Sequence, residues 1–146
     1  ISLTALRIAK EWGKKEKLKN MSLVQATMTN LPFNDCRLDA VISVSVLHHA
    51  IKKDIAKTIE EVHRILKKDG FFLANLASNN DPRYGEGEKI EAGTFRTLEA
   101  FEEKRFRELH HYSTKQEATK LVAFFAQAKI EPMRDRPNYW KVTAIK

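Results

Sequence analysis

Residues 38–49 read LDAVISVSVLHH, and this stretch determines the fold class. From Leu38 to Leu47 nearly every residue is apolar or small, without alternation of polar and apolar side chains. A strand of this kind is buried on both faces, as in a parallel sheet covered by helices. The pair His48-His49 follows directly. We therefore expect both histidines at the carboxyl end of the strand, where such sheets bind ligands.

The sequence on either side of this strand alternates between helical and strand patterns. We expect helices over 2–18 and 53–68, the second ended by Gly70, and a late helix over 113–128 with Ser113 and Gln116 as a capping box. Strands are expected over 21–26, 71–77, 129–135 and 138–146. This order predicts a Rossmann-like α/β domain with a doubly wound, mostly parallel sheet. The strands at 38–47 and 71–77 should be parallel neighbours.

One long segment fits no helix or strand pattern. Residues 78–93 read SNNDPRYGEGEKIEAG and hold three of the five glycines. A loop of this length within a compact domain is usually functional or disordered. We expect it to act as a lid that is mobile without ligands and orders over the pocket when they bind.

Length and composition favour one globular domain over residues 1–146. No apolar run reaches the length of a membrane span, so no membrane partner is expected. Cys36 is the only cysteine, which excludes a disulfide framework and favours a reducing, cytoplasmic setting. The formal net charge of +7 is compatible with RNA as a partner, although charge alone supports only non-specific attraction.

Two segments resemble a known family. LPFNDCRLDAVISVSVLHH (31–49) and EEVHRILKKDGFF (60–72) are similar to class I S-adenosylmethionine (SAM)-dependent methyltransferases of the type 11 and type 25 kind. The matching positions are Leu31, Pro32, Phe33, Asp39, Glu61, Arg64, Leu66, Lys67 and Gly70. The resemblance implies SAM as the cofactor and an antiparallel last strand at NYWKVTAIK (138–146). It covers the C-terminal two-thirds of that domain.

The front of the family's domain has no counterpart here. The five glycines contain no G-x-G-x-x-G run, so the first strand and the glycine loop that binds the methionine part of SAM are missing. We expect further residues before Ile1 to supply them. Without them, residues 40–47 would form an unpaired apolar edge that a second copy of the chain could cover, giving a homodimer. The chain alone should then bind SAM weakly.

The resemblance also assigns cofactor-binding residues. Thr27 stands where the family usually has an aspartate that contacts the adenine amino group, and its hydroxyl can still accept that hydrogen bond. Met28 would flank the adenine. Small residues at the end of the strand, Ser43, Val44 and Ser45, would let the cofactor approach the backbone.

Histidines are the candidate catalytic groups, because imidazole exchanges protons near neutral pH. His49 and His111 are candidate bases, while His48, His110 and Tyr84 are candidate substrate contacts. Packing or capping is the alternative role for each. We expect no metal site, because adjacent residues of an extended chain point to opposite sides.

These observations support three functions. The first is SAM-dependent methyl transfer to a small-molecule acceptor, which the lid-like loop favours. The second is methylation of tRNA or another RNA, which the basic charge favours. The third is a non-catalytic partial domain that serves as a binding or scaffold module.

Overall fold

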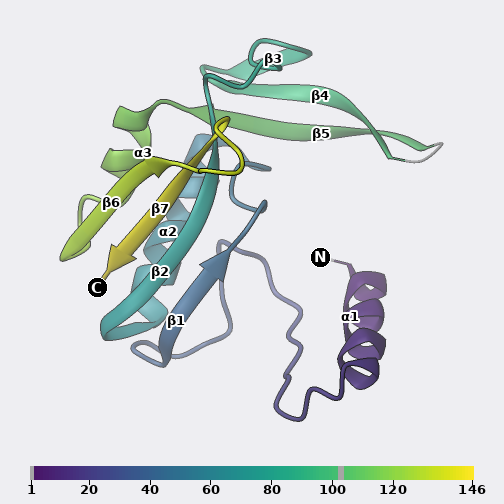
Figure 1. The fold of residues 1–146 in the computed structure, drawn as a ribbon, viewed down its shortest axis with the longest axis vertical. Coiled ribbons are helices and arrows are strands. Elements are labelled where there is room, and N and C mark those ends of the chain that lie inside the picture. The colour runs from purple at the N-terminus through teal and green to yellow at the C-terminus, as the bar shows by residue number, and fades with distance from the viewer. Residues whose placement is uncertain (1, 102–103) are drawn as a thin grey trace.

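The structure is a computed structural model that describes residues 2–101 and 104–146. Figure 1 shows a twisted sheet with helices α2 and α3 behind it, and helix α1 standing apart. In chain order the elements are α1 (Leu3–Lys15), β1 (Leu38–Ser43), α2 (Lys52–Ile65), β2 (Leu66–Ser78), β3 (Glu88–Glu91), β4 (Thr94–Phe101), β5 (Lys104–Ser113), α3 (Lys115–Leu121), β6 (Gln127–Pro132) and β7 (Tyr139–Ile145). Within the described part of the chain, no helix is both long and apolar enough to cross a membrane.

Strand β2 is the centre of the sheet. On one side it pairs in parallel with β1 and, at its carboxyl end, with β5. On the other side it pairs antiparallel with β7, which in turn pairs with β6. The predicted parallel neighbours and the predicted antiparallel last strand are therefore confirmed, and the α/β Rossmann-like fold class is confirmed with them.

Two helices cover one face of this sheet. Ile55, Ile59 and Val62 recur at helical spacing along α2 and are buried to 3% exposure or less. They form one core cluster with Phe72 on β2 and Val142 on β7. This packing fixes the position of α2 on the sheet, and with it the position of the turn that joins β1 to α2.

One arginine fastens the loop before β1 to α2. The guanidinium of Arg64 donates to the carbonyl oxygens of Leu31 (3.1 Å) and Phe33 (2.8 Å). It also pairs with Glu61 at 2.8 Å, and Glu61 accepts the backbone N–H of Leu31 at 2.9 Å. The hydrogen bond from Arg64, followed by that from Leu31, lowers the pKa of Glu61 to about 2. The Leu-Pro-Phe and Glu-x-x-Arg motifs are thus two halves of one contact.

Several predicted boundaries are wrong. Residues 21–26 are not a strand, because no described strand lies beside them to complete a ladder, and Val24 is 48% exposed. Helix α2 ends at Ile65 and not at Gly70, because Leu66 is already extended and pairs with Leu38. At Gly70 a Cβ would lie 2.8 Å from the carbonyl oxygen of Lys67, so this glycine permits close backbone packing instead of capping a helix.

The segment after β2 also differs from the prediction. Residues 88–91 of the expected loop form β3, which pairs with β4, and β4 pairs with β5 along its whole length. This antiparallel β3–β4–β5 unit, which is not among the predicted elements, crosses the carboxyl end of β2 in Figure 1. The capping box of α3 lies one residue later than predicted, at Thr114 and Glu117.

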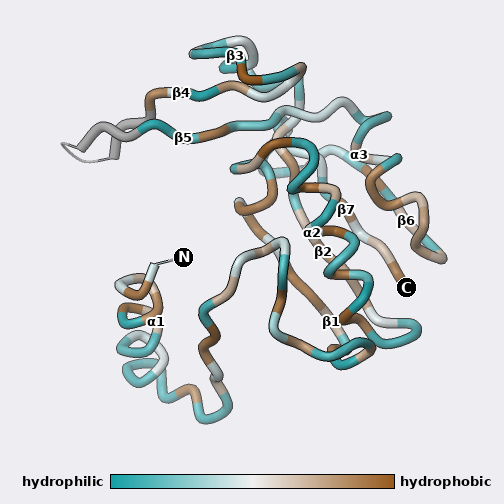
Figure 2. Tube along the Cα trace, turned by 180° about the vertical axis from the view of Figure 1, so that it is seen from behind, coloured by the Kyte–Doolittle hydropathy of each residue, from teal (hydrophilic) through white to brown (hydrophobic). Residues whose placement is uncertain are grey.

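The outer edge of β1 is open. Within residues 2–101 and 104–146, β1 pairs with β2 alone. Ile42 on β1 and Val44, which follows the strand, are 66% and 57% exposed, and on α1 Ile8 and Trp12 are 63% and 69% exposed. Figure 2 shows β1 largely in the hydrophobic colour and α1 again apart from the sheet. Apolar surface of this kind is typical of a site that another segment or chain covers, as the sequence predicts.

The Arg64 contact predicts a stability effect. Arg64→Ala should lower the melting temperature by about 5 °C, because it leaves the Leu31 and Phe33 carbonyls without their donor. The matched control is Arg134→Ala in the exposed segment before β7, which should change it by less than about 1 °C. Circular dichroism during heating measures both. Equal melting temperatures for the two variants would contradict a fastening role.

Candidate functional site

The carboxyl end of β1 leads into a tight turn. Strand pairing stops at Ser43, so the strand is four residues shorter than predicted, and Ser45 takes a φ of +54°. The backbone N–H of Ser45 donates to Oδ1 of Asn75 at 2.6 Å. Asn75 lies within β2 and is 2% exposed, and its Nδ2 has no hydrogen-bond partner among the described residues. The turn therefore has the small side chains of Ser43 and Ser45, and the buried Asn75 Nδ2 beside it is a donor without an acceptor among the described residues.

His48 and His49 lie beyond this turn and no longer in the strand. A second turn at residues 47–48 reverses the chain, and the carbonyl oxygen of His48 accepts the backbone N–H of His111 at 2.7 Å. As a result the two neighbouring rings lie on the same side, with centroids 4.2 Å apart. The expectation that they point to opposite sides is wrong, because it assumed an extended backbone.

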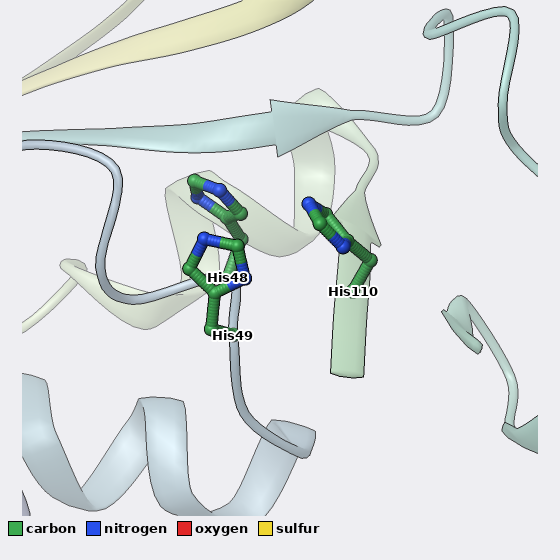
Figure 3. Close-up of side chains that lie close together, drawn as sticks. All are labelled: His48, His49 and His110. Atoms are coloured by element: carbon green, nitrogen blue, oxygen red, sulfur yellow. The ribbon is translucent and has the colours of Figure 1, made fainter. Parts of the chain in front are cut away.

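His110 on β5 completes a cluster of three imidazoles. Its ring centroid lies 5.4 Å from that of His48 and 4.6 Å from that of His49. Each ring offers a nitrogen, and these nitrogens all lie within 4.8 Å of one another. Figure 3 shows His48 and His49 together on the segment after β1 and His110 facing them from β5. We call these three residues the histidine cluster.

The surroundings of His48 keep its ring uncharged. His48 is 1% exposed, and burial, together with the neighbouring His49, His110 and Arg83, lowers its pKa to about 3. The buried carboxylate of Asp81 acts in the opposite direction but is itself paired with Arg83 at 3.1 Å. At neutral pH the His48 ring is therefore neutral and can accept a hydrogen bond or bind a cation.

His111 is not part of this cluster. Successive residues of an extended strand point to opposite faces, so His111 leaves β5 on the side away from His110. Its Nδ1 lies 2.7 Å from Thr94 Oγ1, and burial, followed by the charge of Lys52, lowers its pKa. It borders a cleft of about 380 Å³ between α2 and α3, which Lys52 and Glu117 also line.

Tyr84 belongs to an aromatic layer beside the cluster. Its ring packs edge-on against Phe95 (5.4 Å) and Tyr112 (5.8 Å) and is 47% exposed. Tyr112 in turn stacks on His110 with centroids 5.8 Å apart. A movement of Tyr84 would therefore affect the position of His110 through the ring of Tyr112, which contacts both.

Thr27 and Met28 lie in a turn closed by the Asn30 N–H, which donates to the Thr27 carbonyl oxygen at 3.2 Å. Thr27 is exposed, whereas Met28 packs against the main core together with Val41 of β1. The sequence prediction missed Asn75. The signal was present, because Asn75 is the one polar residue inside the apolar run at 71–77.

Comparisons with known proteins agree with this architecture. The profile of a family described as "Methyltransferase domain" matches residues 1–74. An uncharacterized methyltransferase of Bacillus subtilis, YcgJ, is 32% identical over 68 residues, which are 47% of this chain and 26% of that protein. The chain thus spans about a quarter of this curated relative.

Solved structures share the fold. A SAM-dependent methyltransferase from Methanosarcina mazei aligns with a TM-score of 0.73 at 20% identity, over 100% of this chain and 79% of that one. A Burkholderia thailandensis 1,6-didemethyltoxoflavin-N1-methyltransferase, solved with bound 1,6-didemethyltoxoflavin and S-adenosylhomocysteine, aligns with a TM-score of 0.56 at 21% identity, over 96% of this chain and 55% of that one.

The hydrogen bond between Asn75 and Ser45 predicts a local effect. Asn75→Ala should cost about 1–2 kcal/mol of unfolding free energy and speed hydrogen exchange at the Ser45 amide, because that N–H loses its acceptor. The control is Asn80→Ala in the exposed segment after β2, which should leave Ser45 protected. Unchanged exchange at Ser45 in Asn75→Ala would contradict the assigned contact.

Proposed function

Because this chain belongs to the methyltransferase domain family, we propose that it transfers a methyl group from SAM to a small-molecule acceptor. The observation that carries the proposal is the histidine cluster. It lies at the carboxyl edge of the sheet, just beyond the turn that ends β1, where open α/β sheets bind their ligands.

The turn after β1 fits the polar part of the cofactor. The backbone of Ser43, Val44 and Ser45 would bind the amino group of SAM, and the buried Nδ2 of Asn75 offers a further donor nearby. Structural neighbours support this cofactor, since one of them was solved with S-adenosylhomocysteine. SAM supplies a methyl group on a positively charged sulfur.

The adenine end would lie at the turn of Thr27 and Met28. The Thr27 hydroxyl is exposed and able to accept a hydrogen bond from the adenine amino group. Met28 is partly buried against the core, so its side chain is held in place to flank the ring. These two residues and the turn after β1 are the part of the proposed cofactor site that this chain supplies.

The acceptor would lie against the histidine cluster. Methyl transfer needs a nucleophile aligned with the sulfur–methyl bond, and a protic acceptor must also lose its proton. His49 is the member of the cluster with the most exposed side chain, 26%, and its Nδ1 lies 3.2 Å from a Glu108 oxygen. His48 and His110 are buried next to it and would line the site.

RNA is the second candidate acceptor, favoured by the net charge of +7. A small molecule is preferred because two of the three rings of the cluster are buried. His48 and His110 are 1% and 4% exposed, and the β3–β4–β5 unit crosses the sheet beside them.

The two acceptor classes can be separated directly. With tritiated SAM, we expect label in small-molecule products of an acceptor library and none in bulk tRNA. His49→Ala should lower turnover about 100-fold, because it removes the cluster's exposed ring, whereas His63→Ala on α2 should not. Label in tRNA would show that the acceptor is RNA and not a small molecule. Absence of transfer with the whole protein and both substrate classes would refute catalysis.

The segment after β2 would regulate access. We propose that residues 78–87, which carry Tyr84 and the Asp81–Arg83 pair, close over the site when cofactor and acceptor bind. Hydrogen exchange of the protein with and without S-adenosylhomocysteine and acceptor measures this. We expect slower exchange over 78–87 with ligands and little change over the α3 helix. Equal exchange in both states would contradict a lid.

A further inference from the structure

Three histidines from two separate elements meet in one place. His48 and His49 come from the turn after β1, and His110 comes from β5, more than sixty residues later in the chain. Two of the three imidazoles, those of His48 and His110, are buried, and burying an imidazole costs free energy unless its nitrogens have partners. Such a grouping therefore requires an explanation beyond packing.

The clearest observation is the ring of His48. This side chain is 1% exposed, and its Nδ1 has no hydrogen-bond partner among the described residues. Buried polar atoms in native proteins are nearly always paired, with protein, water or a bound group. An unpaired imidazole nitrogen that lies next to two other imidazoles is a nitrogen available to a cation.

His49 is oriented as a metal ligand would be. Its Nδ1 lies 3.2 Å from a Glu108 oxygen and 3.3 Å from the Leu109 carbonyl oxygen. Histidines that bind metals usually donate their other ring N–H to a carboxylate or a backbone carbonyl, which fixes the ring and its tautomer. Here this contact would leave Nε2 of His49 to face the ion.

Geometry and charge also suit a small divalent cation. Nitrogens bound tetrahedrally at about 2.0–2.1 Å from Zn²⁺ lie about 3.4 Å apart. Ring rotations that shift each nitrogen of the cluster by roughly 1 Å would bring them to this spacing. The ligand nitrogens of the cluster lie within 4.8 Å of one another. A metal ligand must be unprotonated, and the lowered pKa of His48 keeps its ring so at neutral pH. The Asp81 carboxylate adds negative charge nearby, partly offset by Arg83.

We propose that His48, His49 and His110 bind a divalent transition-metal ion, with Zn²⁺ as the best fit. Three neutral imidazoles are a common ligand set for zinc and leave a fourth coordination position open. The ion would join the turn after β1 to strand β5. The expectation of no metal site rested on the alternation of side chains in a strand, which the structure does not show at these residues. The proposal does not depend on methyl transfer.

Metal binding is measured on the tag-free protein without SAM or acceptor. Calorimetry with Zn²⁺ at neutral pH should show one ion per chain with a micromolar or lower dissociation constant. Cobalt(II) should give the strong visible absorption of a four-coordinate site. His49→Ala should weaken binding at least about tenfold and remove the cobalt bands. Because this ring is partly exposed, the variant is suited to keep its fold, which circular dichroism checks.

The matched control is His63→Ala. This histidine lies on α2 against Phe124 and Phe125, outside the cluster, so its removal should leave zinc affinity within about twofold. Zinc should also raise the melting temperature of the wild type and the control but not of His49→Ala. Absence of binding at micromolar zinc, or equal affinity of His49→Ala and His63→Ala, would overturn the proposal. Because no methyl transfer is involved, failure here leaves the proposed activity standing, and the converse holds.

Discussion

The contact between Arg64 and the loop before β1 is the constraint on which the site depends. It fixes the start of β1 against the end of α2, through two carbonyl oxygens of the loop and the carboxylate of Glu61. With both ends of this β–α unit held, the turn between them has little freedom. The positions of Ser45, His48 and His49 follow from that geometry, because all three lie in the short connection between β1 and α2.

Patterns local to the chain predicted the central part of the fold. The apolar runs around residues 40 and 74 and the amphipathic helix between them indicated two parallel neighbours, and the structure pairs Ala40 with Phe71 and Ser43 with Ala74. The family followed from the same region, because its motifs are the residues that make the Arg64 contact. The ligand site at the carboxyl end of β1, and the roles of its residues, stay predictions.

The antiparallel unit and the histidine cluster could not be found in this way. In β4, Thr94 and Thr97 are buried while Leu98 is 61% exposed, so hydrophobicity does not follow burial there. A period-two pattern is then too weak to indicate a strand. The cluster depends on a turn at residues 47–48 and on a register that brings His110 beside it. Both are properties of the folded chain, and no local sequence pattern near His48 predicts either of them.

The place of β7 has a consequence for how the domain is made. This strand is synthesised after every other element described above, yet it pairs with seven residues of the central strand, from Phe71 to Ala77. Until it arrives, one side of β2 has no ladder partner, and Trp140 cannot reach the Ser113 carbonyl oxygen to which it donates. This side of the sheet therefore cannot close until β7 has been synthesised. In the meantime the nascent chain exposes a β edge, which is prone to pair with other chains.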